Sequence, residues 1–364
     1  MTTNTALAET QNTFNEAKAE AFAGQMIDAL NSASLVLMTS IGHRTGLFDV
    51  LAGTPSTTVA NLAQKANLAE RYVREWLSVL ATTGVVDYEP ATKTFTLPAE
   101  HSAFLTRAAT PNNIAVEAQF LGVAFEVEEE IIQRFRDGKG LHYHHYGRFH
   151  EVMAESSHQS VVCSLNEHIL PLIPGILARL RSGILVADVG CGQGLALLKL
   201  AEAFPASRFI GYDLCTDAFQ QAQKTAIEKK LTNLTFVEKD LSTATSLGTY
   251  DLILAFDAVH DQKDPQGLLD TVRNSLAEDG VFLMQDIGGS SYLEKNTDVP
   301  LAPFLYMMST MHCTPVSLGQ GGAGLGTMWG VEMAEGMLKK AGFSTIDLNR
   351  LPHDIVNAYF IARP

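Results

Sequence analysis

Cysteine, tryptophan and positive charge are all scarce in this chain of 364 residues, which has four cysteines, two tryptophans and 26 lysines and arginines. No two cysteines form a C-x-x-C pair, so nothing in their spacing indicates a disulfide framework. Sparse, scattered thiols are typical of reduced proteins, and we expect a cytoplasmic location. The cysteines are Cys163, Cys191, Cys215 and Cys313.

The shortage of positive charge excludes whole classes of partner. Aspartate and glutamate together number 40, which leaves a formal net charge of −14. A chain with this balance repels nucleic acid and anionic membrane surfaces. Long hydrophobic runs are also missing, because the most apolar window, 301–313, is shorter than the ~18 residues of a membrane-spanning helix and contains polar side chains. We therefore expect no nucleic acid and no membrane as partners.

The first hundred residues predict a small, mainly helical domain. Residues 1–22 lack the basic start and apolar run of a signal peptide, and we expect a flexible tail there. Apolar residues then recur at helical spacing over 26–51, which predicts two helices that are buried on more than one face. Two further helices and a hairpin follow before Glu100, and this order predicts a winged helix-turn-helix within a dimerisation domain over 23–108.

The rest of the chain divides at a change of pattern near Gly183. Residues 109–182 are predicted to be helical and to form a linker and lid. From 183 to 364 short apolar runs alternate with helical stretches, which predicts an α/β domain with a parallel sheet covered on both faces. Its last two strands are expected to form an antiparallel hairpin, and the runs expected as strands are 184–189, 208–212, 235–238, 250–256, 280–285, 343–349 and 356–362.

One segment of this α/β domain indicates a cofactor. Asp188-Val189-Gly190-Cys191-Gly192-Gln193-Gly194 follows the first buried strand and precedes a helix, and glycines in such a turn let a ligand approach the backbone. Asp213 ends the second strand, where a carboxylate accepts hydrogen bonds from ribose hydroxyls. A nucleoside cofactor is implied. The acidic Asp188 suits a cationic ammonium better than a pyrophosphate, which argues against a dinucleotide.

Through 188–194 and Asp213, this domain resembles the class I S-adenosylmethionine-dependent methyltransferases. The resemblance implies a Rossmann-like sheet of seven strands and S-adenosylmethionine as cofactor, which becomes S-adenosylhomocysteine. It implies that Gly190 and Gly192 lie against the cofactor, that Asp213 holds its ribose, and that Asp240 and Leu241 flank its adenine, unless Asp240 merely caps a helix. The expected cofactor residues are Asp188, Gly190, Cys191, Gly192, Gly194, Asp213, Leu214, Asp240, Leu241, Phe256 and Asp257.

Together with the winged helix, the domain is similar to small-molecule O-methyltransferases and to bacterial methyltransferase-regulator-like proteins. The segments that carry this second resemblance are 71–77, 149–153 and 319–330. A His-Asp-Trp segment supplies the base in such O-methyltransferases, and here His260-Asp261-Gln262 stands after the fourth strand. His260 is thus the candidate catalytic base for a hydroxyl acceptor, with helix capping as the alternative.

Two further groups of residues are candidates for contact with ligands. Histidines crowd 142–150, but their spacing matches no zinc motif, so we expect no metal there and instead a lid in which Tyr146 or Arg148 meets the carboxylate of the cofactor. His312, Cys313 and Trp329 are candidates for substrate binding, with ordinary packing as the alternative for His312 and Cys313.

The sequence therefore predicts a homodimeric enzyme that methylates a small molecule, most simply on a hydroxyl. Two alternatives remain: a DNA-binding transcriptional regulator that senses S-adenosylmethionine or another small ligand, and a catalytically inactive dimerisation protein. Residues 55–100 carry four basic and five acidic side chains, whereas a DNA-binding module needs an excess of positive charge.

Overall fold

A computed structural model describes residues 14–364 of the chain. The chain divides into two compact units at Ala108 and Ala109. Of the tail expected over 1–22, residues 1–13 lie outside the described part, and the remainder differs from the expectation. A helix begins at Glu16, and the side chain of Asn15 caps it by accepting a hydrogen bond from the amide of Lys18 (3.0 Å). Alanine, glutamate and lysine, which favour helix, dominate the first turns.

The N-terminal unit is a bundle of helices that carries a two-stranded wing. Its elements are α1 (Glu16–Thr45), α2 (Leu47–Ala52), α3 (Val59–Ala66), α4 (Glu70–Thr82), β1 (Asp87–Glu89), β2 (Thr94–Thr96) and α5 (Ala99–Leu105). Trp76 of α4 packs edge-on against Phe48 of α2, and its indole donates a hydrogen bond to the carbonyl of Met38 in α1 (2.8 Å). The predicted helix, helix and hairpin order is thus present.

Helix α1 differs from the prediction in its burial. The buried side chains of α1 lie between Thr39 and His43, and apolar residues nearer its start are exposed, with Leu30 67% and Phe22 62% accessible. The sequence predicted burial on more than one face, which is wrong for this stretch within a single chain. In α2, Leu47, Phe48 and Leu51 are buried, but they lie on one face of the helix, so burial is one-sided there as well.

The C-terminal unit contains an extended helical segment followed by an α/β domain. Its helices are α6 (Gln119–Phe125), α7 (Glu128–Asp137), α8 (Phe149–Ser157), α9 (Ile176–Ser182), α10 (Leu195–Ala203), α11 (Thr216–Glu228), α12 (Pro265–Asn274), α13 (Ala302–Met308), α14 (Thr314–Gly319) and α15 (Val331–Lys340). Its strands are β3 (Leu185–Val189), β4 (Arg208–Asp213), β5 (Leu234–Glu238), β6 (Tyr250–Phe256), β7 (Leu276–Ile287), β8 (Thr345–Leu351) and β9 (Asp354–Arg363).

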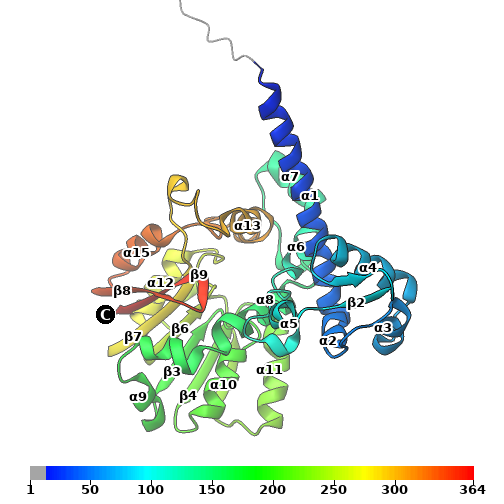
Figure 1. The fold of residues 1–364 in the computed structure, drawn as a ribbon. Helices are drawn as coiled ribbons and strands as arrows, with labels where there is room; N and C mark the ends of the chain where they lie inside the picture. Colours follow the sequence, from blue (N-terminus) through cyan, green and yellow to red (C-terminus); the bar gives the residue numbers. More distant parts are fainter. Residues whose placement is uncertain (1–13) are drawn as a thin grey trace, which may run out of the picture. The chain divides into compact units, whose positions relative to one another are not determined.

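These strands form one seven-stranded sheet in the order β5-β4-β3-β6-β7-β9-β8. Strands β3 to β7 are parallel to one another, and β9 pairs antiparallel with both β7 and β8, which confirms the predicted C-terminal hairpin. Helices cover both faces of the sheet (Figure 1). One core holds apolar side chains of α9, α10 and α11, and the other holds those of α12 and α15.

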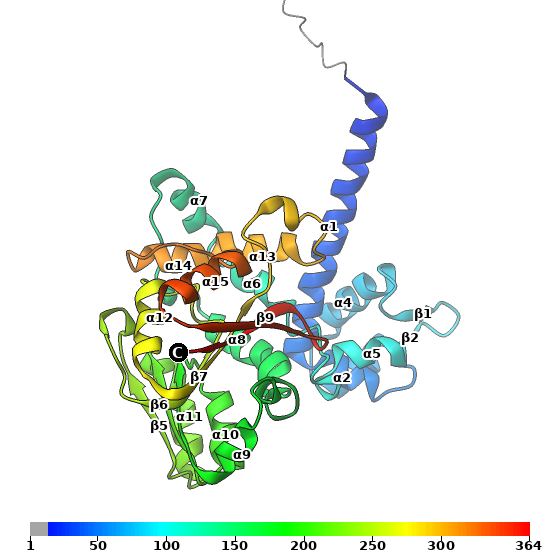
Figure 2. The ribbon, with the colours of Figure 1, turned by 90° about the vertical axis from the view of Figure 1, so that its left-hand side faces the viewer.

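The helical segment before the sheet packs against the insertion that follows β7. Phe120 of α6, Ile131 of α7 and Val152 of α8 share a core with Met308 and Val316, which lie at the end of α13 and in α14. Figure 2 shows α13 and α14 in orange on the same side of the sheet as α6 and α7. Within residues 14–364, no helix combines the length and apolar character that crossing a membrane requires.

Candidate active site

The strand order reverses beside β3, and a cavity lies at the carboxyl ends of the strands there. Because β4 and β6 flank β3 and their connections leave in opposite directions, a crevice opens after β3, where ligands bind in sheets of this type. Residues after four of the strands meet in this cavity, so the topology joins segments that are far apart in sequence. Those that the sequence singled out and that line it are Asp188, Gly190, Cys191, Gly192, Gly194, Asp213, Leu214, Asp240, Leu241, Phe256 and Asp257. Asp261, which was not a predicted site residue, lines it as well.

Glycines in the loop after β3 expose backbone along one wall of the cavity. Gly190 has a φ of 75°, and a Cβ there would stand 2.5 Å from the Cβ of Ala258. Gly192 has a φ of 49°, and a Cβ there would meet no protein atom within 4 Å. Both positions therefore favour glycine. At Gly190 a side chain would clash and the positive φ would be strained, whereas at Gly192 only the positive φ disfavours other residues, because the space beside it is open.

Asp213 links the end of β4 to this loop. Its carboxylate accepts hydrogen bonds from the amides of Gly192 (2.8 Å) and Cys215 (2.9 Å). Each oxygen takes one of these bonds, and a carboxylate has about four acceptor sites, so lone pairs remain for the two hydroxyls of a ribose. The residue is partly exposed and lines the cavity.

Asp188, the last acidic residue before the glycine loop, is buried with an unpaired oxygen. Its side chain is 2% exposed, and its Oδ1 has no hydrogen-bond partner among the described residues. Burial, followed by the charge of Asp213, raises the pKa of Asp188 to about 8. A buried carboxylate of this kind gains most from a cationic or hydrogen-donating ligand, which would satisfy the orphan oxygen and favour the charged form.

A second acidic side chain, Asp257, lies at the end of β6 in a strained conformation. Its φ is 49°, which is uncommon outside glycine. Gln285 of β7 donates a hydrogen bond to its Oδ2 (2.9 Å), while its Oδ1 has no partner in residues 14–364. Burial, followed by the charge of Asp286, raises the pKa of Asp257 to about 7. The cavity therefore holds two buried carboxyl groups that each offer one free oxygen.

Asp240 caps a short helical turn, which was the alternative prediction for it, and it also lines the cavity. It accepts hydrogen bonds from the amide (2.9 Å) and hydroxyl (2.6 Å) of Ser242, and so caps a short turn over Leu241–Thr243. The hydroxyl bond is the largest factor that lowers the pKa of Asp240. Leu241 is buried, and the two residues stand beside the cavity after β5.

The lid segment brings different residues to the cavity from those expected. Tyr143 and His150 line it, with their rings stacked at 5.3 Å, and the amide of Gln193 reaches back to the carbonyl of His150 (3.2 Å). Tyr146 and Arg148 are not among its described lining residues. Tyr146 donates its hydroxyl to the carbonyl of Met311, and Arg148 binds Gln119 and Glu151, because both point into the packing between helices. His142, His144 and His145 are exposed.

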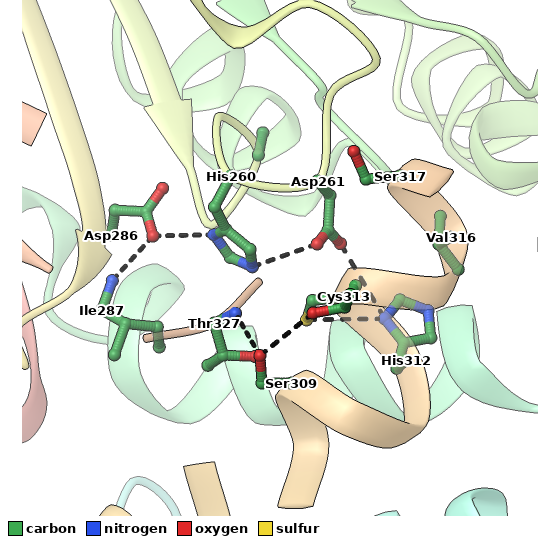
Figure 3. A network of polar contacts seen from close by, with 12 residues as sticks. His260, Asp261, Asp286, Ile287, Ser309, His312, Cys313, Val316, Ser317 and Thr327 are labelled. Atoms are coloured by element: carbon green, nitrogen blue, oxygen red, sulfur yellow. Dashed lines mark hydrogen bonds and ion pairs between the residues drawn. The ribbon is translucent and has the colours of Figure 1, made fainter. Parts of the chain in front are cut away.

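His260 lies behind the cavity wall in a buried polar network (Figure 3). Its Nδ1 contacts Asp286 Oδ1 at 2.7 Å, and its Nε2 stands 3.2 Å from Asp261 Oδ1. The imidazole is buried, whereas Asp261 lines the cavity. Burial lowers the pKa of His260, but the carboxylates of Asp286 and Asp261 outweigh it and raise that pKa well above 6.5.

The three residues predicted as candidates for substrate binding each have packing or hydrogen-bond partners within the protein. His312 is stacked on Phe149 at 3.4 Å between ring centroids, and its Nδ1 is 3.7 Å from the sulfur of Cys313. Trp329 donates its indole N–H to Asp286 Oδ1 (3.0 Å). None of these three is among the described residues of the cavity lining; they lie in the network behind it.

Four residues of the site were not predicted from the sequence, namely Asp261, Asp286, Tyr143 and His150. Asp286 follows the strand predicted over 280–285, but β7 continues to Ile287 and buries it. An acid after a run of apolar residues was the available signal, the same one that marks Asp188 after β3. Tyr143 and His150 belong to a segment that was considered, yet only the packing of α8 decides which of its rings reach the cavity.

Comparison with known proteins agrees with this architecture. Residues 33–107 match the family described as an Rv2258c-like winged HTH domain, and residues 180–314 match the methyltransferase domain family. Human N-acetylserotonin methyltransferase in complex with SAM has a similar structure, with a TM-score of 0.68 and 17% identity over 97% of this chain and 99% of that one. An O-methyltransferase family protein from Burkholderia thailandensis gives a TM-score of 0.66 and 17% identity, covering 94% and 97%.

The chain has the fold of an S-adenosylmethionine-dependent methyltransferase. Sequence relatives match over shorter stretches. (S)-coclaurine N-methyltransferase of Thalictrum flavum is 26% identical over 110 residues, which are 30% of each chain. Trans-aconitate 2-methyltransferase of an Acidovorax species is 30% identical over 122 residues, 33% of this chain and 45% of the relative. The chain thus matches less than half the length of these relatives.

The residues at the cavity fit the cofactor that this fold family implies. S-adenosylmethionine carries a ribose, an adenine, a carboxylate and a cationic ammonium. The cavity offers Asp213 for hydroxyls, an open backbone wall at Gly192, and buried orphan oxygens on Asp188 and Asp257 for a cationic donor. This donor set matches a cation far better than a pyrophosphate, which these carboxylates would repel.

Proposed function

We propose that the protein transfers a methyl group from S-adenosylmethionine to a small-molecule acceptor, in the simplest case a hydroxyl. The observation that carries the proposal is the buried carboxyl group of Asp188, whose Oδ1 has no partner within residues 14–364, beside the glycine loop and Asp213. Within this fold, such an arrangement selects a nucleoside that also bears a positive charge. The O-methyltransferase family protein from Burkholderia thailandensis, whose similar structure covers 94% of this chain, supports the choice of a hydroxyl acceptor.

In the proposed reaction the cofactor supplies an activated methyl group, and this chain's residues supply position and a proton acceptor. Asp213 holds two hydroxyls of the ligand while its own bonds to Gly192 and Cys215 keep it fixed. Asp188 and Asp257 bind the cationic end. Tyr143 and His150 cover the cavity and exclude water, so that acceptor and donor are held in line.

His260 and Asp261 are the groups proposed to take the acceptor proton. Asp286 accepts from Nδ1–H of the neutral ring, which leaves the Nε2 lone pair directed at Asp261, the member of the pair that reaches the cavity. A hydroxyl acceptor that enters beside Asp261 can pass its proton into this pair. The raised pKa of His260 means that the base form becomes more populated as the pH rises above neutrality.

A homodimer is part of the proposal. The exposed apolar side chains of α1 form a continuous stripe at helical spacing, namely Phe22, Met26, Leu30, Leu37 and Ile41. A stripe of this length is unfavourable in water, and a second copy of the same helix covers it by symmetry.

The experiment that tests the proposal is calorimetric titration with S-adenosylhomocysteine. Asp213→Ala should weaken binding by about 1.5–3 kcal/mol, because it removes a charged acceptor from the ribose. Asp217→Ala, an exposed acid four residues later, should leave the affinity unchanged. Equal affinities of wild type and Asp213→Ala would exclude this placement of the ribose, and tight binding of NADH by the wild type would overturn the choice of cofactor.

A further inference from the structure

Three potential metal ligands converge behind the cavity wall. A nitrogen of His260, a carboxylate oxygen of Asp261 and the sulfur of Cys313 all lie within 4.8 Å of one another, and all three residues are buried. Figure 3 shows the imidazole, the carboxylate and the thiol facing one common space between the loop after β6 and the helix that leads into α14.

The cluster also contains an unsatisfied atom that points to a ligand. Asp261 Oδ1 is buried and makes no hydrogen bond within residues 14–364, and it lies 3.2 Å from His260 Nε2. When the imidazole is protonated the two groups form an ion pair, and when it is neutral both present lone pairs to the same space. A buried acceptor in this state costs free energy until a donor or a cation satisfies it.

The three types of ligand atom, together with the contact that Asp286 makes to His260, favour one class of metal ion. Nitrogen, sulfur and carboxylate oxygen together are the ligands of zinc, whereas magnesium and calcium take oxygen only. Zinc–ligand bonds of ~2.0–2.3 Å require the cluster to contract by about one ångström. The other nitrogen of His260 is held by Asp286 at 2.7 Å, and a carboxylate in this place orients metal-binding histidines and fixes their tautomer.

We propose that His260, Asp261 and Cys313 form a Zn²⁺ site, and that the bound ion inhibits methyl transfer. The Nε2 lone pair of His260 and the carboxylate of Asp261 bind the ion, and the thiol of Cys313 binds as thiolate after releasing its proton to solvent. The inhibitory part rests on the proposed function, because the ion occupies the two groups assigned to take the acceptor proton. Binding itself does not depend on that function.

Cobalt binding followed by absorption tests the site without any need for activity. Co²⁺ added to the metal-free wild-type protein should give a thiolate-to-cobalt charge-transfer band that saturates at one equivalent and disappears when Zn²⁺ is added. Cys313→Ser should lose this band, and Cys163→Ser, which removes a thiol outside the cluster, should keep it. Asp286→Asn should keep the band but weaken the affinity for Co²⁺ by ~10–100-fold, as loss of an outer-shell partner does.

The outcomes distinguish failure of the proposed metal site from failure of the proposed methyltransferase function. A wild type without the band, or Cys313→Ser with an unchanged band, overturns the site; binding of S-adenosylhomocysteine by each variant checks that it is folded. If the wild type shows the band and yet fails to bind S-adenosylhomocysteine, the zinc site stands and the proposed function falls. If a known acceptor is methylated equally fast with the site filled and empty, inhibition is overturned.

Discussion

The charge of Asp188, a buried carboxyl group in the cavity wall, is expected to depend on whether the cavity holds a cationic ligand. The pKa of Asp188 is raised to about 8 by burial and by Asp213, so the residue is largely protonated at pH 7 without a ligand. A cationic group placed against it favours the carboxylate and lowers that pKa. We therefore expect a cationic ligand that binds beside Asp188 to release a proton from it.

Proton release on binding is measurable. Titration of S-adenosylhomocysteine at pH 7, in buffers that differ in ionisation enthalpy, should show protons leaving the protein, and Asp188→Asn should release fewer and bind about tenfold or more weakly, because a charged acceptor is lost. Asp217→Asn is the matched control on the exposed surface. Equal proton release by Asp188→Asn and wild type would contradict the assignment.

Asp188 also affects the stability of the protein without ligand. Its folded-state pKa lies above the ordinary value of 3.8, so its contribution to stability is fully present below pH 3.8 and is lost as the pH rises through about 8. Thermal unfolding at pH 8 should therefore show a higher melting temperature for Asp188→Asn than for wild type, with a smaller difference at pH 5.

His260 should contribute to turnover rather than to cofactor binding. His260→Ala is expected to keep the affinity for S-adenosylhomocysteine and to lower turnover by about 10²–10⁴-fold for a hydroxyl acceptor of ordinary pKa, the usual effect of a positioned base. Because its pKa is raised, wild-type turnover should increase with pH above neutrality, and this dependence should vanish in the variant.

Comparison of acceptors distinguishes a base from a packing residue. An acidic phenol gives up its proton more easily and depends less on a general base. The loss of turnover in His260→Ala should therefore become smaller as the acceptor becomes more acidic. His144→Ala, an exposed histidine outside the described cavity lining, should match wild type. Equal losses across the acceptor series, or loss of cofactor binding, would show that His260 acts by packing.

Helix α1 exposes apolar residues that its sequence pattern predicts to be buried. A helix of 30 residues normally buries an apolar face, yet the stripe from Phe22 to Ile41 is uncovered within the chain. Along this helix, Asp28 lies on the face opposite Leu30, because two residues turn an α-helix by about 200°.

Charge on this stripe should separate the subunits. Leu30→Glu, at a position that is 67% exposed in the single chain, is expected to convert a dimer into a monomer, because association would bury an unpaired carboxylate. Sedimentation velocity at several protein concentrations measures the change. Asp28→Lys should stay dimeric, and a wild type that sediments as a monomer at all concentrations would refute the dimer.

Charge is the property of the whole molecule that bears on the regulator alternative. The net charge is −14, and on α4 the exposed arginines are paired within the helix, Arg74 with Glu70 at 2.8 Å and Arg71 with Glu75. Arginines neutralised in this way release few counterions from DNA. The winged helix of this chain is thus poorly suited to nucleic acid.

We expect no specific DNA binding in mobility-shift assays at physiological salt. A variant that combines Glu70→Lys and Glu75→Lys frees the arginines and should bind DNA non-specifically more tightly than wild type, with a steeper salt dependence. Sequence-specific binding by the wild type at ~10⁻⁸ M or tighter would restore the regulator alternative, because operators are bound in that range.

The sequence by itself determined the local parts of this protein. Alternation of apolar runs and helices predicted the seven strands and their hairpin, and the segment 188–194 with Asp213 predicted residues that line the cavity, because turn geometry and strand ends depend on neighbours in the chain. The winged helix was predictable for the same reason. Burial of α1 was not, because it depends on what covers the helix and not on its periodicity.

Only the tertiary structure decided which side chains meet from distant segments. Asp286 reaches His260 because β7 lies beside β6 in the sheet, and Cys313 joins Asp261 because the insertion after β7 folds back over the strand ends. Tyr143 and His150 line the cavity, whereas Tyr146 and Arg148, which were expected to meet the cofactor, are not among its described lining residues. Spacing in the sequence carries no information about such contacts, because they are set by the order of strands and the path of the connections.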